Sequence, residues 1–261
     1  MQTGSIDNQV NPSGSISDIR GYHVESYLAD IGSEVQLFTN NPIEVYLSMG
    51  IVRDSDGSIK PVNVGLMFFS KDPEQFFPGF NTELTLFGDY GGIEEEYTVS
   101  GPLHIQIYRI MEFIQNKILS CRVIKYRDRI KSERLFNYRL NEIEEAVVSA
   151  FHLKDYGTNQ PVRISIHPDR IEITYCSVPD SETSVGGSNV LRPNSKTYRN
   201  NRVEAFLSGL GLISHRSTGA LHDIALSKVD GSASTSFESG RTCSFTKVVI
   251  PTSTRFLDHT F

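Results

Sequence analysis

Two stretches of the sequence concentrate side chains that bind anions. Between Cys121 and Leu140, seven Lys and Arg residues stand against two acids, and the run RPNSKTYRNNR adds four cations with no acid. Tyrosines are interleaved with these cations, which is typical of surfaces that bind phosphate in nucleotides or nucleic acids. Solvated strand and loop residues that offset acidic patches have the same composition, so both interpretations stay open. The residues include Tyr126, Tyr138, Tyr198, Arg192, Lys196, Arg199 and Arg202.

Other reactive side chains do not form a recognisable catalytic or metal-binding motif. His152, Lys154 and Asp155 lie too close together at one predicted helix end to make a triad, and no nucleophile elbow accompanies them. The three cysteines are far apart, which argues against a zinc site and a disulfide framework. The DSDG turn at 54–57 is not a calcium loop, because Gly65 stands where the loop needs its last carboxylate.

Composition sets the broad class of the protein. The chain has 261 residues, 38% of them hydrophobic, and a net charge of -6. This acidic balance excludes a uniformly basic nucleic-acid binder but permits a local basic face. No window approaches the ~18 apolar residues of a membrane span, and the first residues lack the features of a signal peptide. We therefore expect a soluble, cytoplasmic protein with no membrane contact.

Local patterns predict the elements that position these residues. Residues 1–18 are polar and predict a flexible leader, and a second flexible segment is expected from about 252. Asn41, Pro42 and Gly50 are the cap, first-turn and stop signals of one helix. The apolar run 62–69 predicts a buried strand, and the period-two run 82–88 predicts another. Glu94 to Glu96 fit a solvated hairpin edge.

The remaining elements follow from the same rules. Helical spacing predicts amphipathic helices over 102–119 and 140–151, and His104 in the first of them is expected to be an ordinary histidine. Two alternating strands around Pro168 and Asp169 predict a hairpin. The Ser/Gly-rich stretch from Cys176 to about Thr197 is expected to be a long loop that is either a functional lid or disordered. Beyond it the patterns predict helices over 201–213 and 218–229 and a closing strand over 243–251.

Several segments together resemble a known family. In chain order they are YLADIGSE, KPVNVGLMFFSKDPEQFFPG, SGP, FNYRLNEIEEAVVSA, PVRISIHPDRIEI, YRNNRVEAFLSGLGL and RSTG. From about Ser15 onward the chain resembles RecG-helicase-related ATP-binding proteins and transcriptional regulators. That family couples a Schlafen/Alba-type DNA-binding domain to a C-terminal ATPase domain of the histidine-kinase-like (GHKL) type. The DNA-binding core of the family has no counterpart here, so we expect this chain to be the rear portion of such an architecture.

The resemblance implies an α+β fold in two parts. We expect an N-terminal α/β region over 19–120, followed over 121–261 by a GHKL-like two-layer sandwich with helices on a mostly antiparallel sheet. It also implies ATP and Mg²⁺ as cofactors. In the family a helix presents a glutamate that orients the attacking water and, four residues on, an asparagine that holds magnesium. The matching residues are Glu145, a candidate general base, and Ser149, a shorter candidate metal ligand. A solvent-facing helix charge is the alternative for Glu145.

The other elements of the implied nucleotide site depart from the family pattern. A His-Arg-Asp-Tyr run is present as Leu153 to Tyr156, with Lys154 as its cation. A Pro-Gly turn is replaced at Tyr175 and the residues after it, and Gly-Arg-Gly-Thr-Gly becomes HRSTG at 215–219. Lost glycines hinder close approach of backbone to phosphate. The residues implied to contact nucleotide are Ser149, Lys154, Tyr175, Arg199, Asn200, Arg202, Arg216, Thr218 and Gly219.

These departures predict a nucleotide-binding fold with little or no ATP hydrolysis. The expected function is that of an ATP-binding-type module in a RecG-related, DNA-associated transcriptional regulator, which contacts DNA through a missing or separate domain. The alternative is a non-catalytic module that forms homo-oligomers or binds a protein partner as half of a split or truncated regulator. The first hypothesis predicts detectable binding of adenine nucleotide, and the second predicts no ATPase activity and an oligomer in solution.

Overall fold

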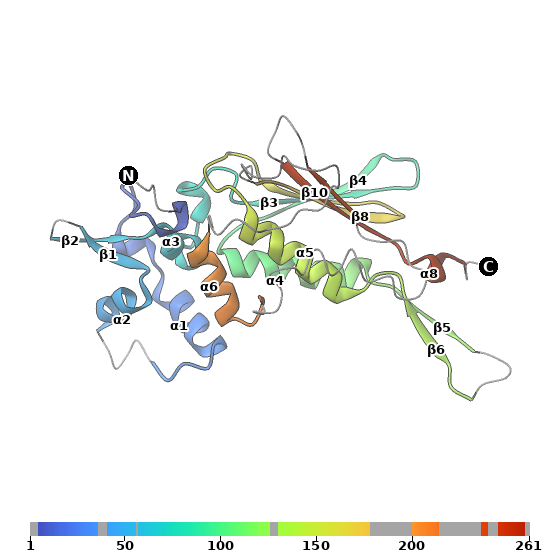
Figure 1. The fold of residues 1–261 in the computed structure, drawn as a ribbon, viewed down its shortest axis with the longest axis horizontal. Coiled ribbons are helices and arrows are strands. Elements are labelled where there is room, and N and C mark those ends of the chain that lie inside the picture. The colour runs from blue at the N-terminus through green and yellow to red at the C-terminus, as the bar shows by residue number, and fades with distance from the viewer. Residues whose placement is uncertain are drawn as a thin grey trace, which may run out of the picture.

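A six-stranded sheet organises the chain in the computed structural model, which describes residues 5–35, 41–55, 57–125, 130–177, 200–213, 236–239 and 245–258. The strand order is β4-β3-β7-β8-β10-β9, and all neighbours are antiparallel except the parallel pair β3 and β7. Strands from both sides of residue 120 therefore share one sheet (Figure 1). The strands are β3 (Thr82–Phe87), β4 (Ile93–Val99), β7 (Val162–Ile166), β8 (Arg170–Cys176), β9 (Ser236–Ser239) and β10 (Phe245–Pro251).

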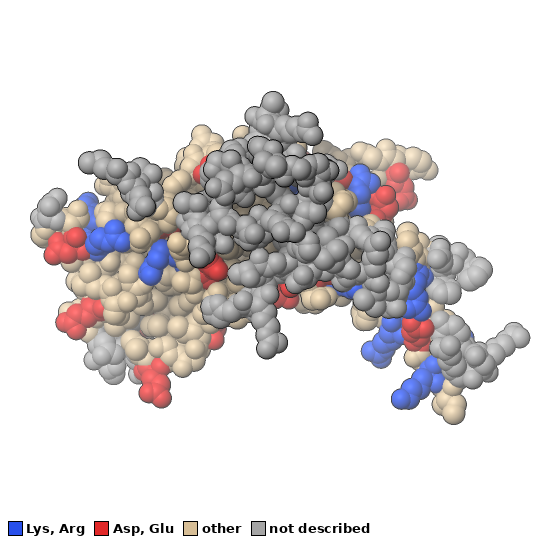
Figure 2. Space-filling view, viewed as in Figure 1, with Lys and Arg blue, Asp and Glu red and all other residues tan. Residues whose placement is uncertain are grey.

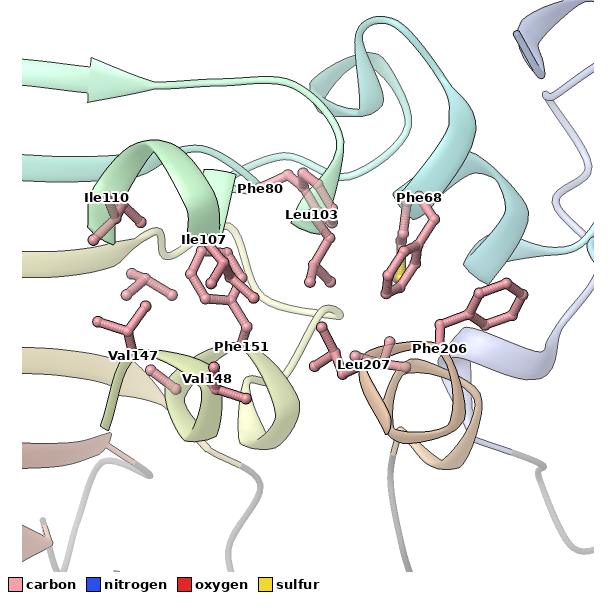
Figure 3. Packing of buried hydrophobic residues seen from close by; sticks show 14 of the residues in the cluster. Phe68, Phe80, Leu103, Ile107, Ile110, Val147, Val148, Phe151, Phe206 and Leu207 are labelled. Atoms are coloured by element: carbon pink, nitrogen blue, oxygen red, sulfur yellow. The ribbon is translucent and has the colours of Figure 1, made fainter. Parts of the chain in front are cut away.

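Side-chain alternation gives the sheet one apolar face. Leu84, Ile164, Ile173 and Val248 lie opposite one another in the register of four neighbouring strands, and all four are buried. Two helices cover this face: α4 (Leu103–Phe113), which continues as a π-helical turn over Ile114–Ile118, and α5 (Leu140–Leu153). Their apolar sides meet in the core (Figure 3), with Ile107 and Ile110 from α4 and Val147 and Phe151 from α5. Phe206 and Leu207 from a third helix, α6 (Asn201–Gly209), join the same core.

The opposite face of the sheet is polar. Arg163 of β7 pairs with Glu83 of β3 at 2.9 Å, and Lys247 of β10 pairs with Glu172 of β8 at 2.7 Å. On β3, β7, β8 and β10 these charged side chains alternate with the buried apolar ones, as expected for a strand period of two. The described residues thus form an α+β fold with helices packed on a mostly antiparallel sheet, as predicted. Among them, no helix has the length and apolarity to span a membrane.

A group of helices and a small hairpin pack at one end of the sheet. Asn41 caps α2 by accepting from the Ile43 amide at 3.1 Å, and Gly50 ends it in the left-handed region at φ 65°. These cap and stop predictions are confirmed. The elements are the 3₁₀ turns η1 (Ile6–Asn8), η2 (Ile16–Asp18) and η3 (Pro73–Gln75), the helices α1 (Gly21–Asp30), α2 (Pro42–Met49), α3 (Asn63–Phe69) and α6 (Asn201–Gly209), and the strands β1 (Val52–Ser55) and β2 (Ser58–Pro61).

The strand predicted over 62–69 is wrong, because the segment forms helix α3. All seven residues of α3 are buried, so the apolar run has no exposed face and its sequence carries neither a helical nor a strand period. Gly65 permits the close packing of α3 on the Ile51 carbonyl, since a Cβ there would lie 2.3 Å from that oxygen. Tertiary packing decided between the two structures that the pattern allowed.

Both terminal segments pack into the fold where flexible ends were expected. In residues 5–18, Asn11 donates to Asn63 of α3, and Val10 forms a β-bridge with Val62. At the other end, Thr252 is buried, and α8 (Thr254–Asp258) follows it. The polar composition of these segments hid their contacts, because each contact is made to a residue far away in the sequence.

Asp7 forms a buried link between the N-terminal segment and the body. Its side chain is 0% exposed, and its carboxylate accepts from the amides of Arg202 at 2.7 Å and Val203 at 3.0 Å. These amides lie in the first turn of α6, where N–H groups have no partner within the helix. Asp7 therefore acts as the N-terminal cap of a helix that lies 195 residues further along the chain.

Replacing this cap should weaken the whole fold. Asp7→Ala leaves two buried amides without an acceptor and is expected to lower the free energy of unfolding by about 1–3 kcal/mol. Urea denaturation at neutral pH measures the change. Asp89→Ala, at an exposed turn position, should alter it by no more than about 0.5 kcal/mol. Equal effects of the two substitutions would show that the Asp7 contacts carry no stability.

Candidate nucleotide site

The α5 helix presents the two residues that the resemblance assigns to catalysis and magnesium. Glu145 and Ser149 are one helical turn apart and both are half-buried, whereas Ile143, Ala146 and Val147 face the core. The i, i+4 spacing places the carboxylate and the hydroxyl on the same side of the helix. Among the described residues, no group of three or more acids, histidines and cysteines is placed to hold a metal ion.

Lys154 lies at the C-terminal end of α5 with its ammonium group turned inward. The side chain is buried, and Nζ donates to the Gln160 carbonyl and lies 5.6 Å from the centre of the Tyr156 ring. Burial lowers the pKa of Lys154 to about 8, although the charges of Cys176 and Asp155 act in the opposite direction. In this arrangement the cation binds the backbone of its own chain.

Asn200 is also used within the fold. Its side-chain amide donates to the carbonyls of His152 at 2.7 Å and Lys154 at 2.8 Å, which belong to the last turn and end of α5. Such carbonyls have no partner within the helix and need one from outside. Lys154 also forms a β-bridge with Ser177, next to the end of β8. Asn200 therefore joins the start of α6 to the end of α5.

Arg202 and Tyr175 lie in different surroundings from this pair. Nη2 of Arg202 donates to the Met49 carbonyl of α2 at 2.6 Å, and the guanidinium packs on the Phe206 ring at 5.6 Å. Its buried Nε has no hydrogen-bond partner within the described residues. Tyr175 is buried in β8, opposite Thr246 of β10, and burial raises the pKa of its hydroxyl. The structure thus brings Lys154 and Asn200 together and leaves Arg202 against α2.

The sequence did not point to an acid–histidine group beside this site. His152 lies 3.7 Å from Glu204, measured from Nε2 to Oε2. Burial lowers the pKa of His152, and the negative charges of Glu204 and Asp7 oppose that shift. Glu204 also lines an open depression on α6, together with Asn201, Ala205, Ser208 and Gly209. No local motif indicates this pair, because His152 and Glu204 come from two helices that are far apart in the sequence.

Four of the expected nucleotide contacts lie outside the described residues. They are Arg199, Arg216, Thr218 and Gly219, and most of the expected long loop and the helix predicted over 218–229 lie there too. The described part of the candidate site therefore consists of α5, the end of β8 and the start of α6.

Comparison with known proteins bears on the fold. No family model matches the chain, and no curated protein matches it. The chain superposes on the crystal structure of the DIP2311 protein from Corynebacterium diphtheriae with a TM-score of 0.69 over 97% of its length. The two sequences are 14% identical, and the match spans 48% of the DIP2311 chain. This chain has the fold of that part of DIP2311. At such low identity the likeness shows the fold and nothing of the activity.

The buried position of Lys154 predicts a pH-dependent stability. Its folded pKa of about 8 lies below the ordinary value of 10.5, so between these values the folded chain binds fewer protons than the unfolded chain. The free energy of unfolding of wild type, relative to that of Lys154→Met, should therefore rise with pH. We expect a rise of roughly 1–2 kcal/mol between about pH 7.5 and 9.5. Urea denaturation at the two pH values measures it. Lys71→Met, at an exposed position, serves as the control. A difference that does not change with pH would contradict this environment for Lys154.

Proposed function

We propose that the chain is an ATP-binding-type module of a RecG-related, DNA-associated regulator in the cytoplasm, and that it binds adenine nucleotide with little or no hydrolysis. The observation that carries the proposal is the i, i+4 pair of Glu145 and Ser149 on one side of α5, the spacing that the family resemblance assigns to ATP and magnesium. Weak hydrolysis is supported by Lys154 and Asn200, whose side chains donate to backbone carbonyls at Gln160 and at the end of α5. Polar residues that the family resemblance assigns to nucleotide are held in place by the protein itself. This arrangement holds the end of α5 and the start of α6 together, and it leaves fewer side-chain donors to bind phosphate during hydrolysis.

The α5 pair supports the same conclusion. Hydrolysis needs a group that orients water and a metal that bridges the phosphates. The resemblance assigns Glu145 to the first role, whereas Ser149 offers one short hydroxyl for the second. A serine ligand reaches magnesium directly in P-loops, where a lysine and a cradle of backbone amides assist it. Here the nearby lysine contacts Gln160. We therefore propose that the chain acts by binding nucleotide, with little or no hydrolysis, and by contacting the rest of a regulator.

Calorimetric titration with Mg-ATP tests this proposal. We expect measurable binding, and phosphate release no faster than the buffer background. Ser149→Asn restores the longer metal ligand of the family and should tighten Mg-ATP binding, with a smaller effect on ATP in EDTA, because its added contact is to magnesium. Glu145→Ala should leave the affinity within about threefold, because that carboxylate is assigned to water.

Two results would reject the proposed nucleotide role. One is the absence of both heat and thermal shift with Mg-ATP for the wild-type chain. The other is rapid phosphate release that is abolished by Glu145→Ala, which would identify an active ATPase. Ser149→Gly is the counterpart of Ser149→Asn at the same position and removes the hydroxyl ligand. It should weaken Mg-ATP binding if the serine contributes to it.

A second function, as a partner-binding module, is favoured by exposed apolar residues on α2. Ile43 and Leu47 are one helical turn apart and are 41% and 40% exposed. Ile31 and Val35, at and beyond the end of α1, are also exposed. Helix residues with this spacing form a contact row that suits a second helix. This module would act by assembly, either with a second copy or with another protein.

Light scattering distinguishes the second function. If the α2 row mediates self-association, the wild-type chain should have the mass of an oligomer, and Leu47→Glu should convert it to a monomer. Glu44→Gln, on the same helix, should leave the mass unchanged. A wild-type chain that is monomeric across the accessible concentration range would count against self-association through α2.

A further inference from the structure

A two-stranded arm projects from the end of the molecule that lies opposite the N-terminal helices (Figure 1). We define the β-arm as strands β5 (Cys121–Ile124) and β6 (Glu133–Phe136) with Lys125 and residues 130–132. The two strands pair antiparallel and belong to a sheet of their own. A ribbon of two short strands is marginally stable in isolation, so its geometry depends on how its base is held.

Asn137 fixes the base of the β-arm to the body. Its side chain accepts from the Ser120 amide at 2.8 Å and donates to the Ile118 carbonyl at 2.9 Å. Its backbone carbonyl accepts from the Ser253 amide at 2.8 Å. One buried residue therefore ties the arm to the end of the α4 segment and to the segment after β10.

The inner face of the β-arm packs against α8. Arg122 and Leu135 are register partners, so they share a face of the ribbon. Leu135 is buried, and the Arg122 guanidinium lies 4.2 Å from the Phe256 ring and donates to the Phe256 carbonyl at 3.0 Å. Glu133, an acid of the arm, lies on the same side and pairs with Arg255 at 2.7 Å. This side is occupied by the body of the protein.

The outer face combines cations with apolar side chains. Val123 and Arg134 are register partners, and Phe136 lies two residues further along the same face. Val123 is 58% and Phe136 47% exposed, and Arg134 is exposed between them. Lys125 continues this alternation beyond β5 and is also exposed. Within the described residues, Lys125, Lys131 and Arg134 make no ion pair.

Charge distinguishes the β-arm from the rest of the molecule. The β-arm has four Lys and Arg residues (Arg122, Lys125, Lys131 and Arg134) against one acid, Glu133, in a chain of net charge -6. Figure 2 shows basic side chains gathered over this hairpin. The local excess of positive charge is complementary to a phosphate backbone.

We propose that the β-arm binds duplex DNA with its outer face. A two-stranded β-ribbon fits the major groove, where cations contact phosphates and apolar side chains contact thymine methyl groups. Lys125 and Arg134 supply the phosphate contacts, and Val123 and Phe136 supply the apolar ones. A second copy of this chain is a weaker fit. A stable dimer buries about 800 Å² on each partner, whereas the outer face of this short ribbon offers two large apolar side chains.

This inference goes beyond the proposed function and does not depend on a nucleotide. Fluorescence anisotropy of a labelled mixed-sequence 20-base-pair duplex, titrated with the full chain in the absence of ATP, tests it. Wild type should bind, with an affinity that falls steeply between about 50 and 200 mM salt. Lys125→Glu with Arg134→Glu should weaken binding by at least about tenfold and make the salt dependence shallower by about two phosphate contacts.

The matched control changes charge equally at exposed positions of the body. Arg53→Glu with Lys71→Glu should leave the affinity within about threefold, after a small non-specific correction for net charge. Lys125→Gln with Arg134→Gln gives a neutral version of the arm variant, and circular dichroism melting shows that each protein is folded. The neutral variant should also lose most of the affinity.

The proposal would be overturned by no binding of the duplex by wild type at low salt, by equal weakening in the arm and body variants, or by unchanged DNA affinity in a folded arm variant. If the arm variant instead lowers the light-scattering mass while DNA affinity is unchanged, the outer face is an interface between copies. Preference for the labelled single strand over the duplex would reject the groove geometry.

Discussion

The buried carboxylate of Asp7 and the first turn of α6 form the interaction on which the surrounding structure depends. A helix N-terminus carries unpaired amides and a partial positive charge, and a carboxylate satisfies both. Here the carboxylate comes from the first described residues, and Ser5 in turn donates to it. The α6 helix then packs Phe206 and Leu207 into the core beside the α1 and α3 aromatics. Because Asp7 occupies the α6 amides, an external anion would have to displace it to bind there.

Fixing the start of α6 also fixes the candidate site. Asn200 immediately precedes the helix, and its amide reaches the last carbonyls of α5. Those carbonyls lie next to Lys154, which bridges towards Ser177 after β8. The N-terminal segment, α6, α5 and the sheet are therefore connected through a short series of polar contacts. A change at Asp7 would reach residues that the family resemblance assigns to nucleotide, although Asp7 itself has no place in that pattern.

The sequence predicted the elements whose signals are local and missed what depends on distant partners. Asn41, Pro42 and Gly50 predicted α2, and the period-two strands predicted β3, β7 and β8, because caps and alternation are written in neighbouring residues. The 62–69 run has no period, so only its burial on all sides explains why it is helical. The polar composition of the first residues did not indicate that Asp7 is buried, because its partners Arg202 and Val203 lie far away in the sequence.

For the candidate site, the i, i+4 spacing was enough to place Glu145 and Ser149 on one side of α5. It could not show that Asn200 binds the last carbonyls of α5, since these bonds join residues 46 and 48 positions apart in the sequence. It also could not show that Lys154 turns inward to the Gln160 carbonyl, because no side-chain pattern marks a contact to backbone. The basic composition of 121–140 indicated a phosphate-binding surface or solvated strands. The strand register decides which cations of the β-arm face outward and which are held by α8.

Buried polar groups limit how a nucleotide can use this site. An unpaired buried donor costs about 1–3 kcal/mol, and more if it is charged. A cleft that relied on a ligand to satisfy Lys154 and Asn200 would be weakened whenever it was empty. In this fold the carbonyls of His152, Lys154 and Gln160 are the acceptors, so the end of α5 stays paired without any ligand. A nucleotide that used the Asn200 amide as a donor would therefore have to break hydrogen bonds that already exist, because both of its N–H groups are taken. Glu145 and Ser149, which are half-buried on α5, take part in none of these three hydrogen bonds.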